Sequence, residues 1–169
     1  MSKAVKQDII TRAEKQIDEI RQEIDYDTRE YTIEFIVNKY REKDDGNLSE
    51  IYIPEFQRNL RWDINHQSLF MESIILGVPI AAIIVAEIKK TGKLAIVDGA
   101  QRVMTLAAFL TNQLQLSNLK TLDSLNGSYF KDLAPSRQRK FKNTSLRTIV
   151  LSDKADERVI NEVFYRINS

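Results

Sequence analysis

The sequence predicts an α+β fold built around one main domain. Apolar residues near both ends of the chain recur as in helices that bury one face, and start and stop signals bound further helices at 64–76 and 101–110. Runs rich in β-branched residues, typical of buried strands, lie at 82–88, 94–97 and 146–151. A chain of 169 residues, 43% of them hydrophobic, is long enough to bury a core.

The start of the chain predicts an amphipathic helix, which we assign to residues 1–30. Its apolar residues form one narrow stripe between charged flanks: Val5, Ile9, Ala13, Ile17, Ile20 and Ile24. Such a stripe either packs on its own domain or pairs with a partner helix, as in coiled coils. The sequence leaves both outcomes open, and an oligomer formed through this helix is one of them.

Residues 31–169 form the expected main domain. Thr32 is a candidate N-cap for its first helix, Asp63 or Asn65 caps the second, and Gly77 ends the second helix. The predicted helices cover 33–40, 63–76, 101–110, 136–142 and 156–166, and the predicted strands cover 50–53, 82–88, 94–97 and 146–151. A hairpin turn is predicted at 91–92, and loops with short elements at 111–133.

The composition excludes several classes of site. The chain has no Cys, which excludes a disulfide, a thiol nucleophile and a Cys-type zinc site, and its single His, His66, excludes a multi-His metal centre. No apolar run approaches the roughly 18–20 residues of a membrane span, and the charged N-terminus lacks a secretory signal. We therefore expect a cytoplasmic protein that does not enter a membrane. The net charge of +1 provides no overall field to hold nucleic acid.

The most informative motif is Asp98-Gly99-Ala100-Gln101-Arg102, between a predicted strand and a predicted helix. A glycine there allows a tight turn, the amides of a helix start attract anions, and an arginine can form a fork onto a phosphate. In the functional interpretation Gly99 turns the chain and Arg102 binds phosphate. Gln101 orients a ligand or a water molecule, and Asp98 binds a metal ion or accepts a proton. In the structural alternative Asp98 caps the helix and pairs with Arg102.

A second polar cluster, Phe56-Gln57-Arg58 with Arg61 and Trp62, follows a short strand and a proline. Aromatic rings beside arginines suit stacking on bases as well as cation–π contacts. The structural alternative is a surface loop held by Phe56 and Trp62 in the core.

A third cluster is a segment of five cations that contains no acidic residue: Arg137, Arg139, Lys140, Lys142 and Arg147. The first four of these, with Arg61, are candidate contacts for nucleic-acid phosphates. The structural alternative is a solvated helix face.

Five short motifs occur in order along the chain, at residues 53–58 with Trp62, 73–80, 97–102, 129–133 and 163–168. Together they resemble the N-terminal domain of GmrSD-type modification-dependent restriction enzymes, which belong to the ParB/sulfiredoxin-like superfamily. The resemblance runs from about Tyr31 to the last residue. In the family the last motif continues into a Gly-containing segment, so we expect this domain to be truncated at its C-terminal end.

The resemblance implies a ParB-like α+β fold with a small mixed β-sheet flanked by helices. It implies bacterial defence against phage DNA, often DNA that carries modifications, beside an HNH-type nuclease domain or subunit. It also implies that a nucleoside triphosphate is bound or hydrolysed at a motif that is usually Asp-Gly-Gln-Gln-Arg. This chain has Ala100 at the third position, where no side-chain hydrogen bond is available, so binding is expected to depend on Gly99, Gln101 and Arg102.

Carried over to this chain, the resemblance suggests roles for both polar motifs. Arg58 and Arg102 would bind the nucleotide phosphates, next to Gly99 and Phe56. The catalytic set would be Gln57, Asp98, Gln101 and Arg102. Its two glutamines would position the ligand or the attacking water, and Asp98 would hold Mg²⁺, which prefers carboxylates and substrate phosphates. Such a site works by positioning and charge neutralisation, as an NTPase or as a component of a restriction system.

Two alternatives to an NTPase stay open at this point. One is a non-catalytic sensor or regulatory module that binds DNA or a partner protein. The other is a ParB-like DNA nuclease, whose Mg²⁺-dependent strand cleavage would require Asp98.

Overall fold

The computed structural model describes residues 3–44, 46, 48–57, 61–153 and 157–168. Its helices are α1 (Lys3–Glu23), α2 (Ile33–Arg41), α3 (Ile64–Leu76), α4 (Ala100–Leu110), α5 (Pro135–Lys142) and α6 (Glu157–Asn168). Short 3-10 helices occupy Glu55–Gln57, Asp123–Leu125 and Phe130–Asp132. Its strands are β1 (Tyr26–Thr32), β2 (Ile51–Tyr52), β3 (Ile83–Glu87), β4 (Leu94–Asp98) and β5 (Ser145–Leu151).

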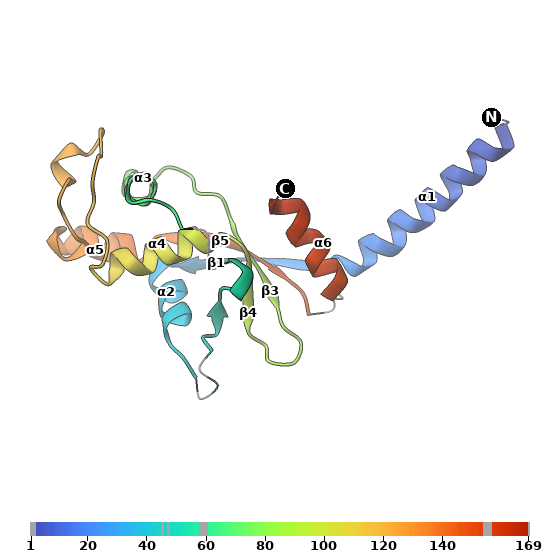
Figure 1. Ribbon diagram of the computed structural model, residues 1–169, viewed down its shortest axis with the longest axis horizontal. Helices are drawn as coiled ribbons and strands as arrows, with labels where there is room; N and C mark the ends of the chain where they lie inside the picture. The colour runs from blue at the N-terminus through green and yellow to red at the C-terminus, as the bar shows by residue number, and fades with distance from the viewer. Residues whose placement is uncertain (1–2, 45, 47, 58–60, 154–156, 169) are drawn as a thin grey trace.

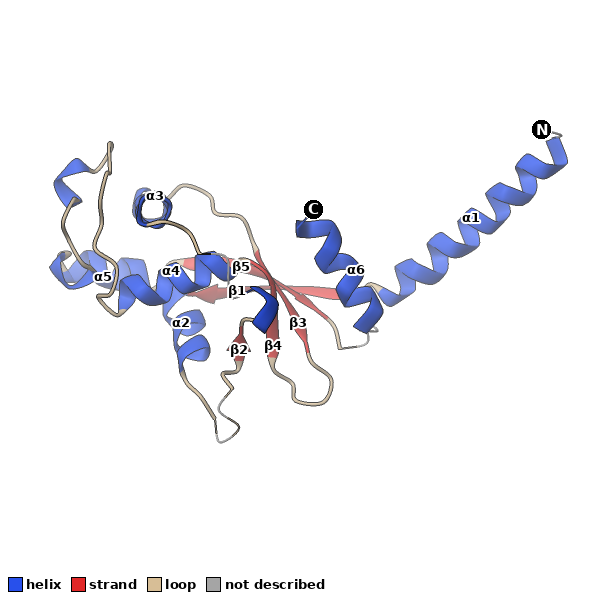
Figure 2. Ribbon diagram, viewed as in Figure 1, coloured by secondary structure: helices blue, strands red, loops and turns tan. Residues whose placement is uncertain are grey.

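The five strands, red in Figure 2, form one mixed sheet in the order β1-β5-β3-β4-β2. Strand β1 is antiparallel to β5, and β3 is antiparallel to β4. The β5–β3 and β4–β2 pairs are parallel. The predicted α+β class and the small mixed sheet are therefore both confirmed.

Both faces of the sheet are buried. Because successive side chains of a strand point to opposite faces, neighbouring residues of one strand belong to two different cores. Val85, Ile96 and Val150 belong to the main core, which includes residues of α2, α3, α4 and α5. Their neighbours Ala86, Val97 and Leu151 form a second, smaller core. Partly buried apolar residues of α6 pack against that second core: Ile160, Val163 and Phe164.

Local signals place most elements where the sequence predicts them. The Thr32 hydroxyl accepts a hydrogen bond from the amide of Phe35 at 3.2 Å, which confirms it as the N-cap of α2. Asp63 caps α3 in the same way, and Gly77 ends that helix in the left-handed conformation, with φ of 77°. The predicted hairpin turn connects the antiparallel strands β3 and β4.

The N-terminal region differs from the prediction of one helix over residues 1–30. Helix α1 ends at Glu23, and Tyr26–Thr32 form strand β1, which pairs along its whole length with β5. Strand β1 lies at the edge of the sheet, and four of its seven residues are exposed. Charged residues are common on edge strands, and they hide the apolar alternation by which a strand is recognised in a sequence.

Helix α1 projects away from the sheet and from the other helices, as Figure 1 shows. Its described side chains are exposed except for that of Ala13, which is half-buried. Within the described residues, no helix combines the length and the apolar character needed to cross a membrane.

Candidate functional site

The corner between β4 and α4 turns at Gly99, as the sequence predicts. Gly99 is the N-cap residue of α4, with φ of 101° and ψ of 12°, a conformation that favours glycine. A Cβ atom added to it would lie 3.2 Å from Nη2 of Arg102 and 3.3 Å from Cγ1 of Ile83. The glycine is therefore needed both for the backbone conformation and for the close approach of the Arg102 side chain.

The Arg102 guanidinium is held by the protein on two sides. Its Nη2 donates a hydrogen bond to Oδ2 of Asp98 at 2.7 Å. Its Nη1 donates to the backbone carbonyl of Ala82 at 3.1 Å and to that of Ala81. The side chain is only 12% exposed. The structural alternative for this motif predicted that Asp98 pairs with Arg102 and caps α4. The ion pair is confirmed. The cap is wrong, because Asp98 still belongs to β4 and Gly99 takes the N-cap position.

Two glutamines fasten the loop between β2 and α3 to this corner. The side-chain amide of Gln57 donates to the carbonyl oxygens of Ile96 at 2.9 Å and Val97 at 3.2 Å, both in β4. The side-chain oxygen of Gln101 accepts a hydrogen bond from the backbone amide of Trp62 at 2.8 Å. Both predicted catalytic glutamines therefore hold two distant segments of the chain together.

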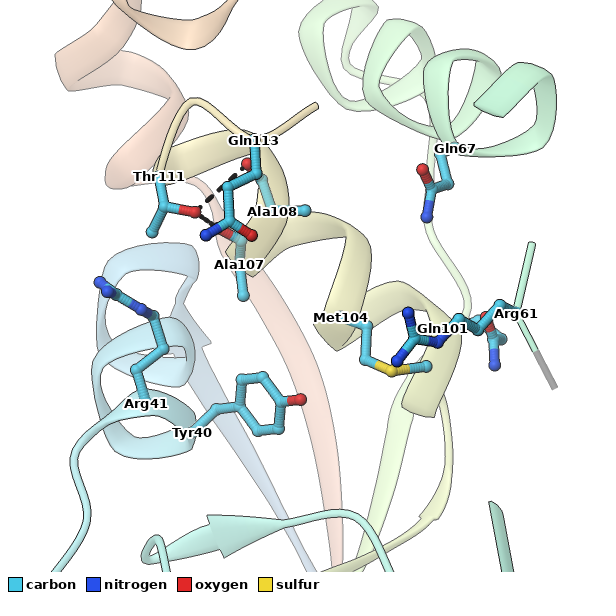
Figure 3. A pocket seen from close by; sticks show the side chains of 10 residues that line it. All are labelled: Tyr40, Arg41, Arg61, Gln67, Gln101, Met104, Ala107, Ala108, Thr111 and Gln113. Carbon is cyan, nitrogen blue, oxygen red and sulfur yellow. Dashed lines mark hydrogen bonds between the residues drawn. The ribbon is translucent and has the colours of Figure 1, made fainter. Parts of the chain in front are cut away.

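A cleft lies beside the corner, between α2, α4 and the loop before α3. It consists of two cavities of about 300 Å³ and about 360 Å³, and Tyr40, Arg61 and Met104 line both of them. In Figure 3, Tyr40 and Arg41 come from α2, whereas Gln101 and Met104 come from α4. Arg61 extends from its loop toward Met104 (Figure 3). Cavities of roughly 300–1,000 Å³ are typical of small-molecule sites.

The described lining of the cleft is positively charged. Arg41 and Arg61 line the first cavity, and Arg61 and Lys43 line the second. Among the described residues, no acidic side chain lines either cavity, and none lies within salt-bridge distance of these three cations. Burial raises the pKa of the Tyr52 hydroxyl in the second cavity, so this group stays protonated and can donate a hydrogen bond.

Gln101 and Arg102 are neighbours in the sequence, but their side chains lie on different sides of α4. Gln101, Met104 and Ala108 lie on one side of α4, at steps of three and four, and all line the first cavity. Arg102 lies about 100° further round the helix and lines neither cavity. Gln101 therefore belongs to the cleft, and Arg102 belongs to the ion pair with Asp98.

The structure brings together only part of the predicted nucleotide site. Arg58 and the side chain of Phe56 lie outside the described residues. Arg61, predicted as a nucleic-acid contact, lies in the cleft instead of beside the other basic residues. Tyr40 and Arg41 also line the cleft but were not predicted from the sequence, although they too place an aromatic residue beside an arginine, as Arg61 and Trp62 do.

The basic segment forms the surface of α5. Arg137, Arg139 and Lys140 are exposed, and no described acidic residue lies within salt-bridge distance of them. Lys142 differs, because its ammonium group pairs with Glu34 of α2 at 3.2 Å. Three of the four predicted nucleic-acid contacts in this segment are thus exposed cations on one short helix.

Asp98 is the predicted metal ligand, and its surroundings limit what it could hold. Its Oδ2 already accepts a hydrogen bond from Arg102, and the side chain is 35% exposed. The described part of the chain contains no group of three or more His, Cys, Asp or Glu side chains placed to hold a metal ion. A Mg²⁺ ion here would need ligand phosphates and water besides Asp98, a combination that Mg²⁺ commonly adopts.

The mixed sheet, the motif at the β4–α4 corner and the adjoining basic cleft define an α+β domain with a ligand-sized site. The family model described as "GmrSD restriction endonuclease, N-terminal domain" matches residues 33–169. The chain therefore belongs to this family, which is one of restriction-type defence proteins. No curated protein and no solved structure matches the chain.

Proposed function

We propose that this restriction-type domain binds a nucleotide in the cleft between α2 and α4. The observation that carries the proposal is the charge of the cleft, which Arg41, Lys43 and Arg61 line without any described acidic residue. Cationic side chains that lack a counter-charge attract phosphate groups, and arginine binds them through two parallel hydrogen bonds. DNA cleavage belongs, in this proposal, to an HNH-type domain or subunit.

The lining residues suggest how a nucleotide would lie. Arg61 lines both cavities, so its guanidinium is the group best placed to bind the phosphates. Arg41 and Lys43 add positive charge in one cavity each. Tyr40 lines both cavities and offers an aromatic ring for the base. Gln101 offers its amide at the end of the cleft next to the corner (Figure 3).

Arg102, Asp98 and Gln57 support this site indirectly. The ion pair and the bonds to the carbonyls of Ala81 and Ala82 hold the start of α4, from which Gln101 reaches the cleft. Gln101 in turn holds the backbone of Trp62, the residue next to Arg61. Arg102 thus positions the start of α4, whereas Arg61 binds the phosphates.

Arg61→Ala is expected to weaken nucleotide binding about 10- to 100-fold, because a hydrogen bond to a charged group is worth about 1.5–3 kcal/mol. The side chain of Arg61 is exposed, so the urea midpoint of the variant should equal that of the wild type. Calorimetric titration with ATP, GTP, CTP and UTP in the presence of Mg²⁺ measures the affinity and shows which base is preferred.

Arg139→Ala is the matched control, because it removes the same exposed charge from α5, outside the cleft. Its affinity for the nucleotide should equal that of the wild type. Wild-type affinity in Arg61→Ala would move the ligand out of the cleft, and failure of the wild type to bind all four nucleotides would refute nucleotide binding itself.

Phosphate release from the same nucleotides, with and without DNA, separates an NTPase from a binding module. Release that is lost in Arg61→Ala would show turnover in the cleft. Binding without release would support the non-catalytic module.

Ala100, which stands where the family motif usually has glutamine, packs in the core and is only 7% exposed. The position where the family motif usually has glutamine is therefore an interior position in this chain.

We also propose that α5 contacts DNA, which the exposure of Arg137, Arg139 and Lys140 favours. Replacing all three with Ala should weaken DNA binding and lower the slope of log affinity against log salt by about 1 for each lost phosphate contact. Replacing Lys89 and Lys90, exposed cations on the β3–β4 turn, should leave that slope unchanged. Equal salt slopes for the α5 variant and the wild type would place DNA on another surface.

A further inference from the structure

None of the residues that the structure describes covers the apolar stripe of α1. The side chains of Val5, Ile9, Ile10, Ile17 and Ile20 are 45–52% exposed, on a helix that projects from the domain (Figure 1). Most of the stability of helices in proteins comes from the packing of one apolar face. The stripe therefore favours a partner that the single chain does not supply.

The stripe has the form of a pairing surface. At 3.6 residues per turn, its apolar residues fall within about 140° of the helix circumference. The helix has 21 residues, which corresponds to about 32 Å of length at 1.5 Å per residue and to three heptads of a coiled coil. The small residue Ala13 lies close to the midpoint of the stripe, where two paired helices can approach closely.

The charges of α1 are divided between its two halves. Residues 3–12 carry three cations and one acid, a formal charge of +2, whereas residues 14–23 carry two cations and four acids, a formal charge of −2. Two copies in parallel would place like charges side by side. Two antiparallel copies would place each positive half beside a negative half, which lowers the electrostatic energy of the pair.

We propose that α1 pairs with α1 of a second copy of this chain in an antiparallel arrangement. Arg12 and Glu19 lie on the same flank of the stripe and on opposite sides of its midpoint, and in the single chain each pairs within its own helix, Arg12 with Asp8 at 2.5 Å and Glu19 with Lys15 at 3.8 Å. Antiparallel pairing brings Arg12 of one copy near Glu19 of the other, twice in the symmetric dimer. The domains join α1 at its C-terminal end, so antiparallel helices also hold the two domains about 30 Å apart.

The molecular mass in solution tests the pairing. Sedimentation equilibrium of the full chain should give twice the chain mass of 19.6 kDa as concentration rises. The double variant Ile9→Asp with Ile20→Asp should be monomeric, because it places charges in the stripe. Thr11→Asp, on the polar side of α1, is the control and should remain dimeric. A monomeric wild type, or a dimeric stripe variant, overturns the proposal.

Cross-linking tests the direction of the helices, and the absence of native Cys makes each introduced thiol unique. Ile9 of one copy should face Ile20 of the other. Ile9→Cys alone and Ile20→Cys alone should therefore form little disulfide-linked dimer under mild oxidation, whereas an equal mixture of the two variants should form it readily. Efficient self-linking of Ile9→Cys would show parallel helices and would overturn the antiparallel arrangement.

Discussion

Arg102→Ala is expected to lower the free energy of unfolding by about 2–3 kcal/mol. This loss is smaller than the cost of breaking a fully buried ion pair, because Asp98 is partly exposed. The variant removes the partner of Asp98 and the donor to the carbonyls of Ala81 and Ala82. It also leaves a gap beside Gly99, whose missing Cβ makes room for the guanidinium. Urea unfolding followed by circular dichroism measures the change.

A double-mutant cycle with Asp98→Ala shows whether the ion pair causes this loss. We expect a coupling energy of about 1–2 kcal/mol between Asp98 and Arg102. Arg102→Lys should recover only part of the stability, since an ammonium group cannot form the fork that reaches both the carboxylate and the carbonyls. An unchanged urea midpoint with complete loss of nucleotide binding would contradict the positioning role and would support direct phosphate binding by Arg102.

Phe109→Ala is expected to lower the free energy of unfolding by about 3–5 kcal/mol, the usual cost of removing a buried aromatic ring. Phe109 is fully buried in α4. Its ring lies edge-on to Phe130 and Phe141, with centroid distances of 5.5 Å and 5.4 Å. Because Phe141 is the buried residue of α5, this cluster attaches the basic helix to the domain. Urea unfolding of the variant measures the loss.

Phe35→Ala is the control for the aromatic cluster, because Phe35 loses the same atoms from a position that is 38% exposed. Its destabilisation should stay below about 1 kcal/mol. If Phe109→Ala leaves too little folded protein, Phe109→Leu keeps much of the volume and should show a smaller loss in the same direction. Equal stability of Phe109→Ala and Phe35→Ala would contradict the burial of this cluster.

Elements with a local signal could be predicted from the sequence. Thr32 and Asp63 cap helices through hydrogen bonds to amides only three residues away. Gly77 ends α3 because its own backbone adopts a positive φ. Strand β1 lacks such a signal, since its stability comes from pairing with β5, more than a hundred residues later in the sequence.

The candidate site could be predicted only in part. The motif at 98–102 could be placed at a strand-to-helix corner from the sequence, because the strand, the glycine and the helix start are all encoded locally. The directions of its side chains were not predictable, since Arg102 finds its carbonyl partners about twenty residues earlier in the chain and Gln101 finds Trp62 about forty residues earlier.

The α+β class, the family resemblance, the helix caps and the amphipathic character of α1 could all be predicted from the amino-acid sequence. Each of these depends on residues that are close together in the chain or on the order of short motifs along it. The tertiary structure alone decided that the Arg102 guanidinium donates to the carbonyls of Ala81 and Ala82 and that Arg61 lies with Tyr40 and Arg41 in one cleft. These facts depend on which distant segments the sheet and the core bring together, and residue spacing does not record that proximity.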